Sequence, residues 1–438
     1  MSYLNSVRFI LCLAFLSPRV FFLFIKDFFL SARLNRRADI DKYNNESFEE
    51  IVRFAFESCK YYQKIFSLKG VDYFLKNKAE IPLLDKNIIR SEFGDIVSNK
   101  NEPYRVLSSG GSTGEPLKYQ ISLLSDAYSH YLLYKGLKNG GYSLGDKIAV
   151  FAGGSLVSKK TSKKEKIVSI LLNKRKYSSY GVTNQEINHI IRDMNIWKPK
   201  ILRGYVSSIL FMAEYIIDNK LEINFKLKSV FTTSEMLTPN ARKVIEKAFS
   251  CSVFDSYGLN DGGLSAFECI NHSMHIDPER GLLEVIDENS GENIFDKPGI
   301  IVATTLVERR FPLIRYKTGD LGVMSKKMCS CGKETYVLEK LVGRETDFLE
   351  INGKKVGSPV LTVLMGKVDC KKYQIIQEKD DSITFNLLVD NENEFIKKSK
   401  PLIVNSLQSH FGNIDINFKF IGEFEKSVNG KHKFIIRR

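Results

Sequence analysis

Short apolar strands alternate with helices between residues 121 and 256, and this alternation limits the possible fold more than any other feature. A strand pattern begins at Ile121, and further ones cover residues 147–151, 200–202, 229–233 and 253–256. Helix patterns lie between them at residues 125–137, 183–197 and 207–219, and another begins at Thr238 and Pro239, a cap followed by a first-turn proline. Because a helix between two strands returns the chain to the same edge, successive strands run parallel. The pattern predicts an α/β body with a largely parallel sheet.

The rest of the chain divides around this body. Residues 35–100 read as helical, and residues 277–345 are rich in strand patterns. From about residue 346 the pattern changes to a hairpin over 373–389, a helix over 393–411 and a strand over 416–421. We therefore expect an apolar helical segment at 1–34, a large α/β domain with a β-rich subdomain at 35–345, and a small α+β domain at 346–438.

The apolar N-terminal segment admits two interpretations. Its two apolar runs, at residues 7–16 and 20–25, are separated by Ser17, Pro18 and Arg19. Neither run reaches the ~20 residues that a membrane-spanning helix needs. The segment is either a monotopic anchor with basic flanks, lying on a membrane surface, or a pair of buried helices of the body.

The charge balance is basic, with 65 Lys and Arg against 51 Asp and Glu, a formal net charge of +14. Such a balance suits anionic lipid, nucleotides, acidic sugars or nucleic acid. No recognisable nucleic-acid motif accompanies it, so we expect no nucleic-acid partner. The basic run at 159–176 is either a contact for an anionic partner or a solvated loop and helix. The seven cysteines, an odd number with no cleavable signal, favour a reducing compartment and hence the cytoplasm.

A glycine-rich stretch, SSGGSTGEPLK, extends from Ser108 to Lys118. Backbone amides and hydroxyls in such a loop can converge on one anion, and a lysine adds a point charge. Phosphate is the natural ligand, although the spacing is not that of a Walker A loop. The alternative is a flexible surface turn.

Four further motifs follow this loop in order. They are FTTSEML at 231–237, DSYGLNDGG at 255–263, RYKTGDLG at 315–322 and LVGRETDFLEINGKKV at 341–356, and the chain closes with SVNGKHKFIIRR. In these motifs and their order the chain resembles the adenylate-forming superfamily of acyl-CoA ligases, peptide-synthetase adenylation domains and luciferases. The resemblance covers residues 17–438. Within it the chain is similar to the phenylacetate–CoA ligase branch, and WKPKILRGYVSSIL at 197–210 is similar to the CapK-like, capsular-polysaccharide members of that branch.

The resemblance implies an ATP-dependent, AMP-forming ligase with a nucleotide site. The positions expected to hold the phosphates of ATP are Ser108, Ser109, Gly110, Gly111, Ser112, Thr113, Gly114 and Lys118. Ser234 and Glu235 would line the adenine, and Tyr257, followed by Gly258, would pack on it. Asp320 would accept hydrogen bonds from the ribose hydroxyls, and Arg344 would steady the ribose or phosphate.

Two positions of the small domain complete the implied mechanism. Lys431 would stabilise negative charge on the α-phosphate and carboxylate oxygens during adenylation. Asp347 lies where the family hinges, so the small domain would rotate between two half-reactions.

The sequence departs from the family pattern at two places. Asn260 and Asp261 replace the usual Ser/Thr-Glu, whose glutamate helps to hold Mg²⁺. Aspartate keeps the charge with a shorter side chain, so Asp261 is the predicted Mg²⁺ ligand with altered geometry. Glu115 stands where many relatives have lysine, which weakens the positive field of the loop.

Cysteine and histidine residues form a second constellation. Cys269, His275, Cys329 and Cys331 have the ligand types of a closed, structural zinc site. His272 is the alternative fourth ligand, and some relatives of this branch carry such a zinc. The competing interpretation is a set of unpaired reduced thiols.

The resemblance leaves the acyl acceptor open. We expect the enzyme to convert a carboxylic acid to an acyl-adenylate and to pass the acyl group to an amine or hydroxyl, as an amide or ester on a surface-polysaccharide precursor, at the inner face of the membrane if the N-terminus contacts it. The first alternative is a CoA thiol, as in an aryl- or acyl-CoA ligase of soluble metabolism. The second is a degenerate relative that binds nucleotide without catalysis.

Overall fold

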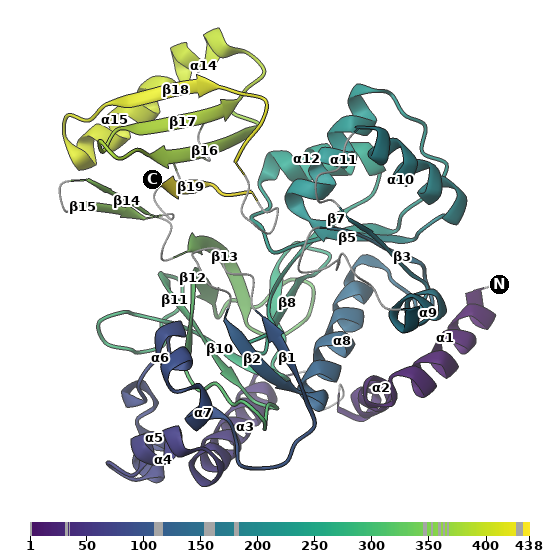
Figure 1. The fold of residues 1–438 in the computed structure, drawn as a ribbon, viewed down its shortest axis with the longest axis vertical. Coiled ribbons are helices and arrows are strands. Elements are labelled where there is room, and N and C mark those ends of the chain that lie inside the picture. Colours follow the sequence, from purple (N-terminus) through teal and green to yellow (C-terminus); the bar gives the residue numbers. More distant parts are fainter. Residues whose placement is uncertain are drawn as a thin grey trace.

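The computed structural model describes residues 2–30, 34, 36–108, 117–152, 163–178, 184–344, 348–351, 354–357, 361, 364–365, 368–425 and 432–438. It confirms the predicted α/β class, with a large body built around one sheet and a smaller C-terminal unit beside it (Figure 1). The central sheet has 11 strands in the order β10-β11-β12-β13-β9-β8-β7-β6-β5-β3-β4. Its two halves differ in strand direction, and the candidate site lies where they meet.

The parallel half contains the strands that the alternating pattern predicts. Its members are β3 (Ile148–Ala152), β4 (Lys174–Ser178), β5 (Ile201–Tyr205), β6 (Ser229–Thr233) and β7 (Val253–Leu259). Alternate residues of each strand enter different cores. Ala149 and Phe151 of β3 pack with α10 (Asn184–Trp197), α11 (Val206–Asp218) and α12 (Pro239–Phe249), whereas Ile148 and Val150 pack on the face that carries α8 (Leu123–Leu137).

The antiparallel half forms the β-rich part of the body. It consists of β8 (Leu264–Glu268), β9 (Met274–Ile276), β10 (Gly281–Ile286), β11 (Pro298–Thr305), β12 (Tyr316–Ser325) and β13 (Val337–Arg344). A helical segment packs against it: α3 (Arg37–Ser58), α4 (Lys60–Phe66), α5 (Val71–Lys76), η1 (Lys78–Glu80), α6 (Lys86–Ser91) and α7 (Phe93–Ile96). The buried guanidinium of Arg315 joins the two, because it donates to the carbonyls of Ala79 and Gly291 at 2.8 and 2.6 Å.

A separate hairpin carries the glycine-rich stretch. Strands β1 (Tyr104–Ser108) and β2 (Lys118–Ser122) pair antiparallel, and Ser108 lies opposite Lys118. The sequence pattern placed the start of this second strand at Ile121, three residues late. Residues 109–116, which connect the two strands, lie outside the described part of the chain.

The C-terminal unit has its own apolar core. Strands β16 (Lys372–Gln377), β17 (Ile383–Leu388), β18 (Ile416–Phe420) and β19 (Ile435–Arg437) form a sheet in the order β18-β17-β16-β19. The helices α14 (Glu392–Lys398) and α15 (Lys400–Phe411) and the hairpin of β14 (Phe348–Ile351) and β15 (Lys354–Gly357) contribute to the same core.

Two predictions of secondary structure are wrong. The single helix expected over 393–411 is two helices that meet at Ser399, because Pro401 lacks an amide hydrogen and its ring clashes with a helix that continues through it. The basic run at 159–176 is not only a loop and a helix: after α9 (Lys163–Leu171) it contributes the edge strand β4, parallel to β3. Lysine and arginine on an edge strand hide its strand character, although they suit that position.

The N-terminal segment packs on the body and also leaves apolar side chains exposed. Helices α1 (Ser2–Leu16) and α2 (Pro18–Leu30) bury Phe9 and Leu23 against the α8 side of the body, while Phe15 and Phe22 on the same helices are exposed. Among the described helices, none is long and apolar enough to cross a membrane alone; residues 9–16 and 18–26 reach that composition only as a pair bent by 118°.

Candidate active site

Three predicted site residues converge at the junction of the two halves of the sheet. The hydroxyl of Tyr257, on β7, donates to Oδ2 of Asp320 at 3.0 Å. The Arg344 guanidinium lies 3.4 Å from Oδ1 of the same carboxylate, and Asp320 and Arg344 are paired across β12 and β13. Strand β7 and the later pair β12 and β13 thus place an aromatic ring, a carboxylate and a guanidinium together.

The backbone around Asp320 is irregular. The register between β11 and β12 shifts between Ile300 and Val302, so β12 bulges over Thr318–Asp320. Gly319 has a φ of +82°, a backbone conformation that residues other than glycine rarely adopt. The Thr318 hydroxyl accepts a hydrogen bond from the Asp320 amide at 3.1 Å and fixes the bulge. The KTGD sequence at residues 317–320 therefore forms the bulge that sets the orientation of Asp320.

Burial and neighbouring groups shift the pKa of Asp320 in opposite directions. Burial raises the pKa of the Asp320 carboxyl, whereas Arg344 and the Tyr257 hydroxyl oppose that rise. Burial, followed by the Asp320 charge, raises the pKa of Tyr257 well above its usual range. Tyr257 is therefore a neutral hydrogen-bond donor, which leaves the remaining lone pairs of Asp320 as the acceptors that the site offers.

Asp261 lies beside this group, in the turn between β7 and β8. Its Oδ2 is 3.3 Å from the Tyr316 hydroxyl, and its Oδ1 accepts from the Gly262 amide at 3.1 Å. Asp261 is 9% exposed, and its negative charge contributes to the raised pKa values of Asp320, Tyr257 and Tyr316. The preceding residue, Asn260, is held by Arg280, which donates to its carbonyl at 3.0 Å and to its side-chain oxygen at 2.8 Å. Asn260 and Asp261, the two residues that depart from the family pattern, therefore lie in a turn held by hydrogen bonds.

The carboxyl ends of the parallel strands complete the site. Ser234 directly follows β6 and is exposed, with a φ of +66° that is unusual for a residue other than glycine. Gly258, near the end of the neighbouring β7, is also exposed. Ligands of open α/β sheets bind at this edge, and the strained position of Ser234 there is consistent with a binding role.

Glu235 has contacts that the sequence did not reveal. Its carboxylate accepts hydrogen bonds from the amide and hydroxyl of Ser207 at 2.6 and 3.0 Å, at the start of α11. It also accepts from the backbone amide of His432 at 3.2 Å. The His432 ring lies 2.9 Å from the Tyr373 carbonyl, within the C-terminal unit. Glu235 therefore joins the body to the segment that follows Lys431, a contact between residues distant in the sequence.

Several predicted residues lie outside the described part of the chain. They are Ser109, Gly110, Gly111, Ser112, Thr113, Gly114, Asp347 and Lys431. Ser108 and Lys118 are described, as partners in the β1–β2 ladder, and both are exposed. The pKa of Tyr119, next to Lys118, is raised by burial and then by Asp261. The hairpin that carries the glycine-rich stretch therefore lies next to the Asp261 turn.

The cysteine and histidine constellation also comes together. The ligand atoms of Cys269, His275, Cys329 and Cys331 all lie within 4.8 Å of one another. The sulfurs of Cys269 and Cys329 are 3.7 Å apart, close to the roughly 3.8 Å expected for two 2.3 Å bonds at a tetrahedral zinc. Nε2 of His275 is 3.2 Å from the Cys331 sulfur, and Nδ1 is held by the Thr335 hydroxyl at 2.8 Å, as the second nitrogen of a metal-bound histidine usually is.

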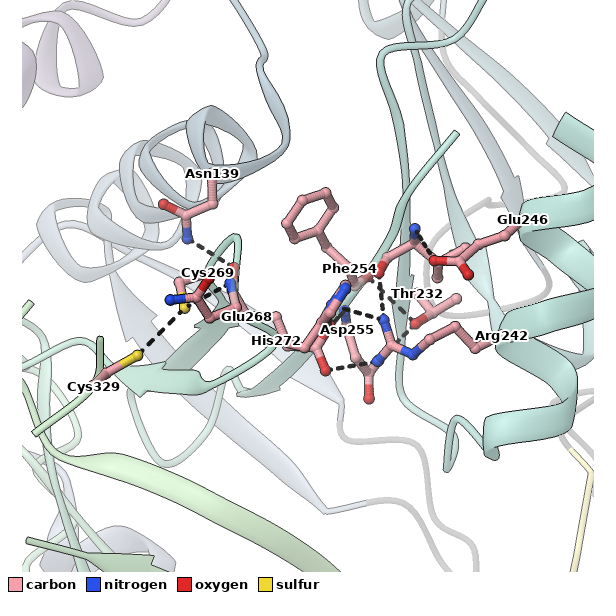
Figure 2. Close-up of polar contacts among 12 residues, drawn as sticks. Asn139, Thr232, Arg242, Glu246, Phe254, Asp255, Glu268, Cys269, His272 and Cys329 are labelled. Atoms are coloured by element: carbon pink, nitrogen blue, oxygen red, sulfur yellow. Dashed lines mark hydrogen bonds and ion pairs between the residues drawn. The ribbon is translucent and has the colours of Figure 1, made fainter. Parts of the chain in front are cut away.

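His272, the alternative fourth ligand, has other partners (Figure 2). Its Nδ1 lies 3.0 Å from Arg242 and 3.2 Å from Glu268. Glu268 also accepts from Arg242 at 2.7 Å and from the Asp255 amide at 2.8 Å, so this network links α12, β7 and β8. Burial raises the pKa of Asp255 to about 7, and Thr232 opposes the shift by donating to it at 2.7 Å. The structure thus favours His275 over His272 as the fourth ligand.

Comparisons with known proteins agree with this architecture. Residues 348–438 match the family model described as the CapK C-terminal domain. The chain is 26% identical over 426 residues to protein CapK of Staphylococcus aureus, covering 92% of this chain and 90% of that protein. It is 25% identical over 364 residues to phenylacetate-coenzyme A ligase of Thermus thermophilus, with coverages of 77% and 78%.

A solved structure has the same fold over nearly the whole chain. 2-Hydroxyisobutyryl-CoA ligase in its postadenylation state superposes with a TM-score of 0.71 at 19% identity, covering 93% of this chain and 91% of that one. The same ligase in its thioester-forming state gives 0.60.

The fold is that of the adenylate-forming ligases, and the resemblance predicted from the motifs is confirmed. Over most of its length the chain is similar to CapK and to phenylacetate–CoA ligases, and residues 348–438 match the CapK C-terminal domain.

Proposed function

We propose that this protein uses ATP to convert a carboxylic acid to an acyl-adenylate. The observation that carries the proposal is the convergence of Tyr257, Asp320 and Arg344 at the edge of the parallel strands. A carboxylate that offers acceptors beside an aromatic ring suits a nucleoside, and the neighbouring guanidinium suits its phosphate. Asp261 is the proposed Mg²⁺ ligand, because it is a nearly buried carboxylate within electrostatic reach of this group.

The remaining roles follow from the motifs. In this proposal residues 108–114 and Lys118 hold the phosphates of ATP, Ser234 and Glu235 border the base, and Lys431 approaches from the C-terminal unit. The chain then forms a large ATP-binding domain at 35–345 and a mobile domain at 346–438 that turns about Asp347. Catalysis would come from positioning and charge neutralisation, because both reacting groups are anionic.

The second half-reaction transfers the acyl group, and we propose an amine or hydroxyl of a surface-polysaccharide precursor as the acceptor. This part of the proposal rests on the resemblance of residues 197–210 to the capsular-polysaccharide members of the branch, and the likeness to CapK covers 92% of the chain, against 77% for the phenylacetate–CoA ligase. Work on such a precursor would place the protein at the cytoplasmic face of the membrane.

A screen of pyrophosphate exchange tests the proposal. We expect purified protein with Mg²⁺ to exchange labelled pyrophosphate into ATP in the presence of one class among sugar acids, amino acids and aryl acids. AMP release that requires an amino or hydroxyl sugar, but not CoA, would support the polysaccharide acceptor. AMP release that requires CoA would assign the chain to thioester formation. ATP binding without exchange for any acid would contradict adenylate formation and favour the degenerate alternative.

We further propose that Cys269, His275, Cys329 and Cys331 bind a structural zinc ion. Cys269 directly follows β8, His275 is the middle residue of β9, and Cys329 and Cys331 lie in the link between β12 and β13. A bound ion would therefore fasten that link to the strands beside the nucleotide site. With four protein ligands the site would be closed, so the ion would have no catalytic position.

Metal analysis tests the zinc site. We expect about one equivalent of zinc per chain, lost in a variant with Cys329→Ser and Cys331→Ser, together with about 2 kcal/mol or more of the free energy of unfolding. Cys251→Ser is the matched control, because Cys251 lies outside the cluster, and it should retain the metal. Wild-type protein that contains no zinc and whose cluster thiols all react rapidly with a thiol reagent would contradict the assignment.

A further inference from the structure

The N-terminal helices carry apolar side chains on two faces. Phe9 and Leu13, four residues apart on α1, are buried, whereas Leu11 and Phe15, also four apart, are exposed. Helix α2 likewise buries Leu23 and exposes Phe22 and Ile25, three residues apart. A surface helix of a water-soluble protein normally has one apolar stripe, so the second stripe requires an apolar partner.

Helix α9 extends this apolar surface. It contacts α1, and the two helices lie on the same side of the molecule (Figure 1). Ile167 and Ile170 of α9 are exposed. Six of the sixteen exposed large apolar side chains among the described residues therefore lie on three neighbouring helices. We call these six the apolar surface: Leu11, Phe15, Phe22, Ile25, Ile167 and Ile170, which are 45% to 86% exposed.

The apolar surface is fixed to the body and is too short to span a bilayer. The ring of Phe9 meets Tyr134 at 5.7 Å, and that of Phe24 meets Tyr131 at 5.2 Å, both on α8. With 15 and 13 residues, α1 and α2 reach roughly 20 Å each, against about 30 Å of hydrocarbon. Their 118° bend also prevents them from acting as one straight span. The helices therefore contact their apolar partner at its surface and do not pass through it.

Charge distinguishes between the candidate partners. Helices α1, α2 and α9 and the adjoining strand β4 carry nine basic residues and two acidic ones, Asp27 and Glu165. Two copies of such a surface would repel each other in a symmetric dimer. An anionic bilayer surface matches both properties, because lipid chains accept the apolar side chains and headgroups attract the bases.

We propose that α1, α2 and α9 form a monotopic docking surface for an anionic membrane. The exposed rings enter the boundary between headgroups and acyl chains, and the body stays in the water with α8 behind the contact. Docking of this kind needs neither ATP nor an acid, so it can fail or hold independently of the proposed ligase activity.

Vesicle co-sedimentation of the full chain tests this proposal. We expect binding to vesicles of phosphatidylcholine with phosphatidylglycerol, weaker binding to phosphatidylcholine alone, and a loss of binding as salt rises. The variant with Phe15→Ser and Phe22→Ser should bind at least about tenfold more weakly, since each ring removes apolar surface from water. Because both rings are exposed, the variant should keep the wild-type circular dichroism spectrum.

The matched control carries Leu68→Ser and Leu402→Ser, two exposed apolar residues that lie outside α1, α2 and α9. It should bind vesicles as the wild type does. Equal vesicle binding by the Phe15 and Phe22 variant would overturn the proposal, as would wild-type protein that stays in the supernatant. Sedimentation velocity without lipid completes the test: a wild-type dimer that the two substitutions dissociate would assign the apolar surface to a second copy of the chain instead.

Discussion

Replacing Lys431 with alanine is expected to reduce pyrophosphate exchange by about 10² to 10³-fold, because a preorganised cation near a developing negative charge contributes this much to catalysis. The residue was identified from the closing motif, and the structure describes the position that follows it. His432 is tied to the body through Glu235, so the segment after Lys431 reaches the end of β6. The measurement is ATP–pyrophosphate exchange with the acid that gives the highest wild-type rate.

Lys433→Ala is the matched control, since it removes the same ammonium group two residues away. Lys433 contributes its backbone carbonyl to a 2.9 Å hydrogen bond with Gln374, and that bond survives the substitution. The control should exchange pyrophosphate at nearly the wild-type rate and unfold at the same temperature. If Lys431→Ala changed the rate no more than Lys433→Ala does, the proposed role of Lys431 would be wrong.

Replacing Asp320 with asparagine is expected to raise the KM for ATP by about 10 to 100-fold, since a hydrogen bond to a charged group contributes about 1.5–3 kcal/mol. Asparagine keeps the size of the side chain but loses the charge that faces Arg344, 3.4 Å away. It also replaces one acceptor oxygen with a donor, so a ribose hydroxyl would meet a donor there. Initial-rate measurements over a range of ATP concentrations give the KM.

Two controls separate this effect from general damage. Tyr257→Phe removes only the hydroxyl that donates to Asp320 at 3.0 Å, so a rise in KM of a few-fold is expected. Asp72→Asn removes an exposed carboxylate that pairs with Arg53, and surface pairs of this kind contribute little. A KM that is unaffected by Asp320→Asn would contradict the assignment of this residue to the nucleotide.

The sequence predicted the fold well because its signals are local. The alternation of strands and helices specified the parallel half, and the capped helix after Thr238 begins where expected: the threonine hydroxyl accepts from the Ala241 amide. The cluster of Cys269, His275, Cys329 and Cys331 was also identifiable, because cysteine and histidine are few and a Cys-x-Cys turn is recognisable. The edge strand β4 was missed, since its Lys-Arg-Lys sequence lacks the apolar pattern on which the prediction depended.

The sequence predicted which residues form the candidate site but not how they contact one another. The order of the motifs named Tyr257, Asp261, Asp320 and Arg344, whereas their mutual contacts depend on strand register and on the bulge before Asp320. Glu235 illustrates the same limit. Its position after β6 suggested contact with a base, but its bonds to Ser207 and His432 arise from the packing of α11 and of the C-terminal unit.

The bond between Glu235 and His432 has a consequence for turnover. This amide–carboxylate hydrogen bond contributes about 1.5–3 kcal/mol to holding the segment after Lys431 against the body. If the C-terminal unit rotates as proposed, Ser207 still holds the Glu235 carboxylate in place. In the rotation that we propose, the body would therefore keep its half of this contact in place, ready to receive the His432 amide again when the C-terminal unit returns.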